Sequence, residues 1–101
     1  MTPLQMEDIQ KELLSLSKWT LKDEKWIERR YLFKEFLQGI QFVNEMAGLS
    51  EDLNHHPFIT IQYKSVIVSL TSWNARGLTQ LDFDMAAKFE EIYEKNSTVS
   101  S

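Results

Sequence analysis

Apolar residues recur at steps of three and four in three stretches of the chain, and this spacing predicts three amphipathic helices. The apolar positions that carry the period are Met6, Ile9, Leu13 and Leu16 in the first stretch, Phe36, Ile40, Val43 and Ala47 in the second, and Met85, Phe89 and Ile92 in the third. Each helix would bury one face and leave the other to solvent, so the pattern predicts helices that share a core.

The residues that flank these stretches predict where the helices begin and end. Thr2-Pro3 is typical of a cap followed by proline at the first helical position, so we expect the first helix to begin there. Gly48 is typical of a helix C-terminus, which places the end of the second helix near Met46. The polar run 50–54 nevertheless has room for another turn before the next element.

Between the helices the pattern changes to alternation, with many β-branched and aromatic residues, and this predicts four strands. The strand-like segments are residues 19–21, 26–33, 58–63 and 66–71. In the second segment Ile27, Tyr31 and Phe33 share one face, but Arg29 interrupts it. The alternation of that strand is therefore imperfect.

The strands come as two adjacent pairs, with a helix before, between and after them. Polar residues 22–25 and the pair Lys64-Ser65 are expected to form turns, and short turns join antiparallel neighbours. We therefore predict one α+β domain of order α-β-β-α-β-β-α, with a four-stranded antiparallel sheet and helices on one face. The domain is expected to span residues 1–96, followed by a disordered tail over residues 97–101.

Composition excludes several classes of function. The 101 residues include no cysteine, which excludes a disulfide framework, a thiolate zinc site and a cysteine nucleophile. The formal net charge of −4 argues against nucleic acid as a direct partner, since proteins that bind it usually carry a basic face. Apolar runs are far shorter than the roughly 20 residues that span a bilayer, and residues 1–8 lack the pattern of a signal peptide. We therefore expect a cytoplasmic protein with no membrane partner.

The chain has two histidines, and they are adjacent, as His55-His56 followed by Pro57. Imidazole titrates near neutral pH, so the pair indicates acid–base work or ligand binding in a loop that Pro57 stiffens. On the pair alone, a polar loop in which both rings are merely solvated stays open as the alternative. We expect no metal site with Glu51 or Asp52, because the spacing matches no known metal motif.

Glu51, Asp82 and Trp73 each have a structural interpretation beside a functional one. Glu51 could be a solvated charge at a helix end. Asp82 could serve only the start of the third helix, in a capping box with the threonine three residues earlier. Trp73 could be a core or rim ring that ends the fourth strand, while Trp19 and Trp26 are expected to form packing or subunit contacts.

Taken together, these residues resemble the signature of the pterin-4a-carbinolamine dehydratase family. The positions that carry the resemblance are Glu51, Asp52-Leu53-Asn54, His55-His56-Pro57, Tyr63, Trp73 and Asp82, with Gly77-Leu78-Thr79 and Phe33-Lys34-Glu35-Phe36 in support. The resemblance covers essentially the whole chain. Many members of the family have a histidine where this chain has Trp73, and an indole donates a hydrogen bond but does not exchange protons near neutral pH.

The resemblance implies dehydration of a 4a-hydroxytetrahydropterin to the quinonoid dihydropterin, a step that recycles the cofactor of aromatic amino-acid hydroxylases. It also implies that no metal and no organic cofactor takes part. In this interpretation His55 is an acid–base group, and His56 holds the pterin and shares the proton transfer. Glu51 would orient a histidine or the pterin, and Asp82 would support the site electrostatically.

By the same resemblance, Pro57, Trp73 and Tyr63 would contact the pterin together with His56. The expected partners are a small-molecule pterin and other copies of the chain, as a homodimer or homotetramer, because family members associate by joining sheets and packing helices. A catalytically weak pterin-binding or dimerisation module is the alternative function, which the tryptophan at position 73 leaves open. Turnover of 4a-hydroxytetrahydropterin distinguishes the two.

Overall fold

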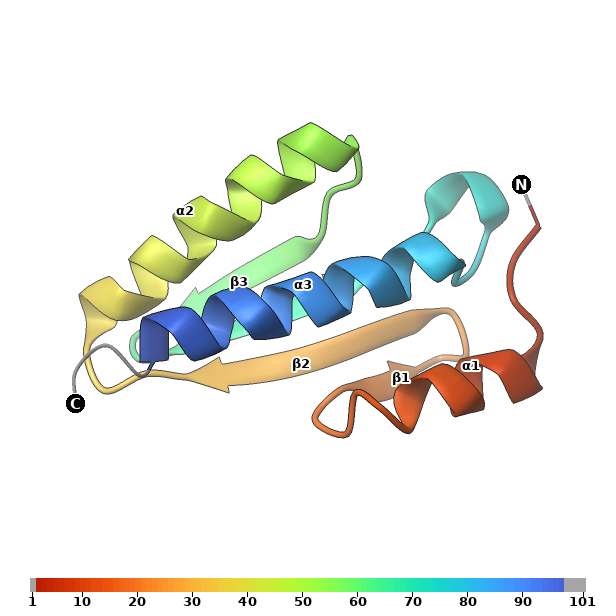
Figure 1. Cartoon of the computed structure of the whole chain (residues 1–101), viewed down its shortest axis with the longest axis horizontal. Helices are drawn as coiled ribbons and strands as arrows, with labels where there is room; N and C mark the ends of the chain where they lie inside the picture. Colours follow the sequence, from red (N-terminus) through yellow and green to blue (C-terminus); the bar gives the residue numbers. More distant parts are fainter. Residues whose placement is uncertain (1, 98–101) are drawn as a thin grey trace.

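The computed structural model describes residues 2–97, which form three α-helices, four strands and one short 3-10 helix (Figure 1). In chain order the elements are α1 (Met6–Leu13), β1 (Thr20–Lys22), β2 (Trp26–Leu32), α2 (Phe36–Leu53), β3 (Phe58–Gln62), β4 (Ser65–Leu70), η1 (Trp73–Ala75) and α3 (Gln80–Ser97). The predicted order α-β-β-α-β-β-α and the α+β class are confirmed.

The strands form one antiparallel sheet in the order β1-β2-β4-β3. The central strands β2 and β4 pair from Ile27 opposite Leu70 to Leu32 opposite Ser65. The chain crosses from β2 through α2 to the far edge, so β3 pairs only with β4 and β1 pairs only with β2. As a result, β1 and β3 are the two edges of the sheet.

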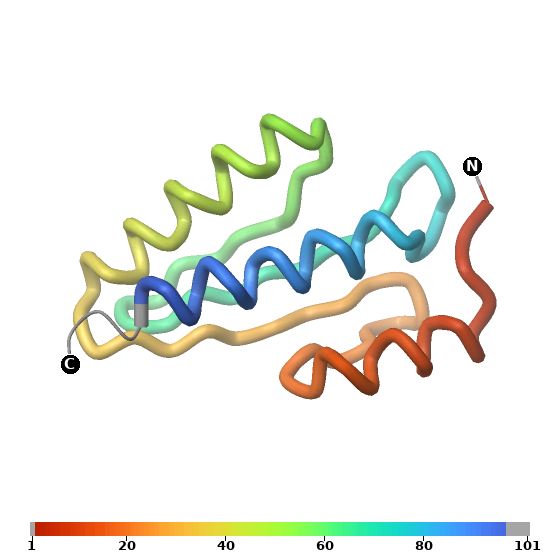
Figure 2. The backbone as a smooth tube through the Cα atoms, viewed as in Figure 1, coloured from red at the N-terminus to blue at the C-terminus, as the bar shows by residue number. Residues whose placement is uncertain are grey.

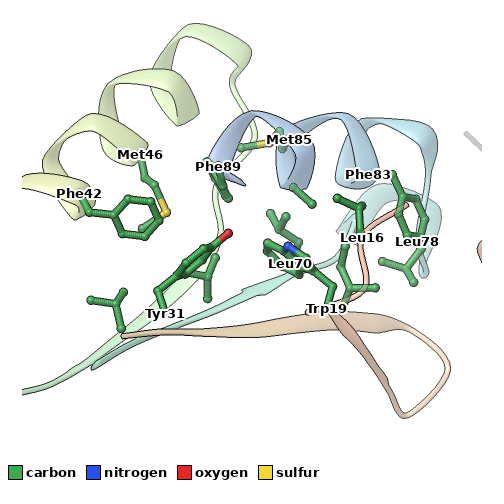
Figure 3. Packing of buried hydrophobic residues seen from close by; sticks show 14 of the residues in the cluster. Leu16, Trp19, Tyr31, Phe42, Met46, Leu70, Leu78, Phe83, Met85 and Phe89 are labelled. Carbon is green, nitrogen blue, oxygen red and sulfur yellow. The ribbon is translucent and has the colours of Figure 1, made fainter. Parts of the chain in front are cut away.

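One face of the sheet carries the core, and α2 and α3 cover that face (Figure 3). The strands contribute the fully buried side chains of Ile27, Tyr31, Val66, Val68 and Leu70. The helices contribute the buried side chains of Phe42, Met46, Phe83, Met85, Ala86 and Phe89. The apolar face of the strands and the apolar faces of α2 and α3 therefore pack against each other in a single layer.

Arg29 interrupts the apolar face of β2. The fold accommodates it at the edge of this layer, because its charge is paired with a carboxylate there. Its guanidinium donates to both carboxylate oxygens of Glu90 on α3, at 3.2 and 3.4 Å, and lies 4.2 Å from the ring centroid of Tyr31. Glu90 also accepts from the Trp19 indole at 3.1 Å and from the Tyr31 hydroxyl. Burial, followed by the hydrogen bond to Glu90, raises the pKa of Tyr31, so its hydroxyl remains a neutral donor.

The prediction that the first helix starts at Thr2-Pro3 is wrong. α1 begins at Met6, because the residues before it run along the loop that precedes α3 (Figure 2). The Leu4 amide donates to the Leu78 carbonyl at 2.8 Å, and a Cβ placed on Gly77 would lie 3.1 Å from Pro3. The amide of Leu4 thus finds its partner outside the helix, and the proline packs against a glycine instead of opening a turn.

The prediction that the second helix ends near Met46 is also wrong. α2 continues through Gly48 to Leu53, because Leu49 and Leu53 pack against the core and extend its apolar face by another two turns. Asn54 then ends the helix in the left-handed conformation, with φ of 50°. The glycine lies in the helix interior, and the polar run after it is helical, as its composition allowed.

The turn between β3 and β4 comes one residue earlier than predicted. Tyr63-Lys64 forms the turn, and Ser65 already pairs with Gln62 as the first residue of β4. Tyr63 adopts φ of 51°, a left-handed conformation that non-glycine residues enter rarely. The residue type therefore gave no local signal for this turn.

The last helix α3 extends through Ser97. Asn96 within it is only 8% exposed, and its side-chain amide donates to Glu45 of α2 at 2.5 Å. Ser97 is thus helical, and residues 98–101 of the predicted tail lie outside the described residues. Within residues 2–97, no helix is long and apolar enough to cross a membrane.

Candidate functional site

His55 and His56 lie in the short connection between α2 and β3. Asn54 ends α2 in the left-handed conformation, which asparagine tolerates better than most residues, and the His55 amide donates to the Ser50 carbonyl at 3.1 Å. Pro57 disfavours the helical conformation for His56, and the strand begins at the next residue. The connection is therefore fixed at both ends, which restricts where the two imidazoles can lie.

The His55 ring pairs with the carboxylate of Asp82, in the first turn of α3. Nε2 of His55 lies 2.7 Å from Oδ1 of Asp82, and the two side chains are 14% and 0% exposed. The other oxygen of Asp82, Oδ2, accepts the Ser72 hydroxyl at 2.7 Å and the Thr79 amide at 2.9 Å. Because a carboxylate oxygen accepts, this arrangement places the proton of the neutral imidazole on Nε2 and leaves Nδ1 as its basic nitrogen.

Asp82 serves the start of α3 and the histidine at the same time. Its bond to the Thr79 amide is one half of the predicted capping box. In place of the other half, the Asp82 amide donates to the Thr79 carbonyl at 3.1 Å, and the Thr79 hydroxyl pairs with the Ser72 hydroxyl at 2.9 Å. Within residues 2–97, every buried side-chain nitrogen or oxygen has a hydrogen-bond partner, and such a satisfied network holds its members in place.

His56 forms a second pair, with Glu51 in the last turn of α2. Its Nε2 lies 2.5 Å from Oε2 of Glu51, and the side chains are 53% and 76% exposed. A histidine–carboxylate contact this exposed contributes at most about 1 kcal/mol to stability, so its main effect is to orient the ring. Across the part of the chain that the structure describes, no three histidine or carboxylate side chains come together as metal ligands.

Both histidines line a cavity of about 390 Å³. Its walls are Asn54, His55, His56, Pro57, Phe58, Ser72, Trp73, Asn74 and Leu81. These residues come from the α2–β3 connection, the start of β3, the loop after β4 and the first turn of α3, which the topology brings to one end of the molecule. A cavity of this size with a few converging polar groups and an aromatic wall is typical of a small-molecule site.

The aromatic wall is Trp73, and two further rings hold it. Its indole is 63% exposed, so it is a rim ring and not part of the core. Trp26 of β2 meets it edge-on, with centroids 5.2 Å apart, and Phe58 of β3 lies 5.9 Å away. Trp26 and Phe58 also contact each other at 5.1 Å. The three rings therefore form one cluster beside the histidines.

The structure does not bring Tyr63 to this cavity. Tyr63 lies in the turn at the opposite end of β3, where its ring stacks with Phe36 at 6.5 Å and the Lys64 ammonium lies 5.1 Å from its centroid. The length of β3 separates it from Pro57, a span of about 20 Å at 3.3 Å per residue. Within one chain, Tyr63 is therefore too far away to contact a ligand held by the histidines.

Sequence reasoning missed several residues of the site. Ser72 carries a bond to Asp82, Phe58 and Leu81 line the cavity, and Trp26 supports Trp73. Phe58 could have been suspected, because it directly follows His55-His56-Pro57. The other residues join the site only through the pairing of β2 with β4 and the packing of α3, which leave no local signal in the sequence.

The fold and this site define a class of protein: an α+β domain in which two histidine–carboxylate pairs and an indole surround one small-molecule cavity. The family model described as "Pterin 4 alpha carbinolamine dehydratase" matches residues 2–92. The chain belongs to the pterin-4-alpha-carbinolamine dehydratase family, and the resemblance inferred from the sequence is confirmed.

Similar proteins extend over almost the whole chain. The curated protein "Putative pterin-4-alpha-carbinolamine dehydratase" of Picosynechococcus sp. is 43% identical over 91 residues, which cover 90% of this chain and 98% of that protein. A protein of the same name from Sulfurisphaera tokodaii is 37% identical over 92 residues, with 91% and 98% covered. The shared region includes the cavity and all the elements that form it.

Two solved structures show the same fold. The "transcriptional coactivator/pterin dehydratase" of Brucella melitensis superposes with a TM-score of 0.87 at 31% identity, covering 91% of this chain and 99% of that one. A pterin dehydratase-like protein described as a RuBisCO assembly factor in the alpha-carboxysome gives a TM-score of 0.66 at 20% identity, with 75% and 89% covered. At that identity, the second structure shares the fold alone.

Proposed function

We propose that this chain dehydrates a 4a-hydroxytetrahydropterin to the quinonoid dihydropterin, with His55 and His56 as the acid–base groups. The observation that carries the proposal is that each imidazole is paired with its own carboxylate at the wall of one cavity. Membership of the family supports the pterin as substrate. The product would be reduced elsewhere, so the reaction would recycle the pterin cofactor of aromatic amino-acid hydroxylases.

The reaction requires two proton transfers and no change of oxidation state. The C4a–O bond breaks, and the hydroxyl leaves as water with the bonding pair and one added proton. The N5 lone pair forms the N5=C4a double bond, and the proton on N5 is then lost. Because one proton is given and one is taken, a pair of imidazoles that donate and accept protons can complete the cycle unchanged.

His55 is the group that we assign to the principal proton exchange. Asp82 fixes its ring through Nε2, so Nδ1 is the nitrogen that can take or give a proton. When Nδ1 is protonated, the carboxylate at 2.7 Å stabilises the resulting imidazolium. This arrangement keeps the ring in one orientation throughout the exchange.

His56 and Trp73 are assigned to pterin binding. Glu51 orients the His56 ring and leaves its Nδ1 for the ligand or for a share of the proton transfer. Trp73 offers a flat face or an indole N–H to the planar, polar pterin, and its contacts with Trp26 and Phe58 hold it in place. Since an indole does not titrate near neutral pH, the proton transfer is left to the two histidines, with water as a further carrier.

The test is a dehydration assay on wild-type protein and on His55→Ala. Turnover is expected to fall by about a hundredfold or more, the scale of a lost acid–base group. His56→Ala is expected to weaken pterin binding and to slow turnover less. Lys34→Ala, an exposed position outside the cavity, is the matched control. A His55→Ala protein that is folded and retains the wild-type rate would overturn the assignment.

A catalytically weak pterin-binding or dimerisation module is the second candidate. It is favoured by Trp73, which stands where many family members have a third histidine, and by the Brucella relative, whose name joins a coactivator to a dehydratase. The same assay separates the candidates. Pterin binding without turnover above the uncatalysed rate would support the module.

A further inference from the structure

A second cavity adjoins the histidine-lined one. Its volume is about 220 Å³, and the two cavities share Ser72 and Trp73 as lining residues. The remaining walls of the second cavity are Lys25, Trp26, Thr71 and Arg76. Because the shared indole is mostly exposed, a ligand that lies against Trp73 in the first cavity can extend across its edge into the second.

The second cavity is lined by two cations and no carboxylate. Lys25 and Arg76 are both exposed, and neither has an ion-pair partner among residues 2–97. The neighbouring hollow on the open face of the sheet differs, because it contains Lys22 together with Asp23 and Glu28. There the lysine lies 4.0 Å from Glu28 and is already neutralised. Of these two hollows, only the cavity beside the indole is lined by cations without a carboxylate.

Hydrogen bonds fix the backbone under both cations. The Lys25 carbonyl accepts the Thr71 hydroxyl at 2.5 Å, which ties the β1–β2 turn to the end of β4. The Arg76 amide donates to the Trp73 carbonyl at 3.1 Å, within the loop from Ser72 to Gly77. That loop is closed by two bonds between its end residues, of 3.0 and 3.3 Å. Two segments distant in sequence thus hold their cationic residues at one place.

We propose that this second cavity is an anion subsite, and that the preferred substrate is a pterin whose side chain carries a phosphate monoester. The proposal rests on the proposed function, since it takes the ring to lie between the histidines and Trp73. A phosphate monoester carries nearly two negative charges at neutral pH, which matches two cations better than a single carboxylate does. The Arg76 guanidinium offers two parallel donors to its oxygens, and Lys25 adds a point charge.

The test measures the dissociation constants of three reduced pterins that differ only in the side chain. The first carries a neutral hydroxyalkyl group, the second the corresponding carboxylate and the third the phosphate monoester. In low salt the phosphate is expected to bind the whole chain about tenfold more tightly than the neutral ligand, and the ratio should shrink in high salt. Arg76→Gln and Lys25→Gln should each reduce the ratio, and the double variant should abolish it. The matched control is Lys22→Gln, which should keep the full ratio.

The outcomes separate this inference from the proposed function. Equal affinity for the neutral and phosphate ligands, or a ratio that survives in the double variant, would overturn the anion subsite and leave the dehydratase proposal standing. If the pterin with a carboxylate side chain bound as tightly as the pterin with a phosphate, the inference that the subsite prefers a doubly charged group would be wrong. If no pterin bound at all, the proposed function would fail and the subsite with it.

Discussion

At the scale of single residues, the site depends on one buried carboxylate. Asp82 is fully buried, and its two oxygens take hydrogen bonds from His55, Ser72 and the Thr79 amide. A carboxylate in this position sets the tautomer of the imidazole and stabilises its charged form, whereas a neutral amide does neither. Under the proposed function, we therefore expect a substitution of Asp82 to affect turnover more than it affects folding.

Asp82→Asn is expected to lower kcat about a hundredfold with little change in KM, because the histidine loses its orientation and its counter-charge. The shape of the pH profile of kcat should change as well, which a merely structural role would not produce. Ser72→Ala removes one donor and leaves the carboxylate, so its kcat should fall by less than about tenfold. A wild-type kcat and pH profile in Asp82→Asn would contradict this role.

Trp73 is expected to affect binding and not proton transfer. Trp73→Ala should raise the pterin dissociation constant and remove the part of the tryptophan fluorescence that the ligand quenches, because the wall of the cavity is lost. Trp73→Phe should keep much of the activity, since a ring remains. Trp19→Phe is the control, because Trp19 is buried in the core and is not among the residues that line the cavity. A lower melting temperature in Trp73→Ala, with unchanged affinity and quenching, would show that the indole only packs.

At the scale of elements, a polar contact joins α2 to α3 away from the site. Glu45 accepts from the Lys95 ammonium at 2.7 Å and from the Asn96 amide at 2.5 Å. These hydrogen bonds, that of Lys95 first, hold the pKa of Glu45 below its ordinary value. A carboxyl whose pKa is lower in the folded chain stabilises the fold above its unfolded pKa, and this contribution is lost as the pH falls through the folded value.

Glu45→Gln is therefore expected to lower the free energy of unfolding by about 0.5 kcal/mol near pH 7, the usual size of a partly exposed pair. The difference between variant and wild type should shrink as the pH falls from about 4.3, the ordinary pKa of a glutamate, through the lower pKa of the folded chain, because the carboxyl protonates first in the unfolded state and then in the folded one. Urea unfolding at several pH values measures it. Glu91→Gln, on the exposed side of α3, is the control. A difference that does not change with pH would contradict the argument.

The order of the elements could be predicted because periods of two and of three to four are local properties of the chain. The residues at which the helices and strands begin and end could not be predicted, because tertiary contacts decide them. Leu49 and Leu53 extend α2 past Gly48 by packing on the core, and Leu4 takes its hydrogen-bond partner from the loop before α3. Tyr63 forms a turn in a conformation that its residue type disfavours.

At the scale of the whole molecule, tertiary contacts also limited how much of the site could be predicted from the sequence. His55, His56 and Pro57 could be found because they are consecutive. The pairing of His55 with Asp82 joins residues 27 positions apart, and only the packing of α3 against the end of α2 brings them together. Tyr63 has the spacing from the histidines that the family resemblance led us to expect. It nevertheless lies at the far end of the extended strand β3, away from the cavity.

The whole chain is expected to assemble with copies of itself. The sheet ends in the unpaired edge strand β3, whose Ile61 is 42% exposed, and α2 carries Leu37 at 73% exposure. Open strand edges and exposed apolar side chains favour association with a second chain. Light scattering at micromolar concentration should therefore give at least twice the chain mass of 11.9 kDa.

Two variants distinguish how the copies meet. Ile61→Lys should dissociate the assembly if sheets join at β3, because a charge on an edge strand opposes pairing. Leu37→Lys should dissociate it if helices pack instead, because the lysine would be buried without a partner. Leu14→Lys, at a position that is 82% exposed just after α1, is the control and should leave the mass unchanged. A wild-type protein that stays at 11.9 kDa over the micromolar range would show that these surfaces do not hold copies together.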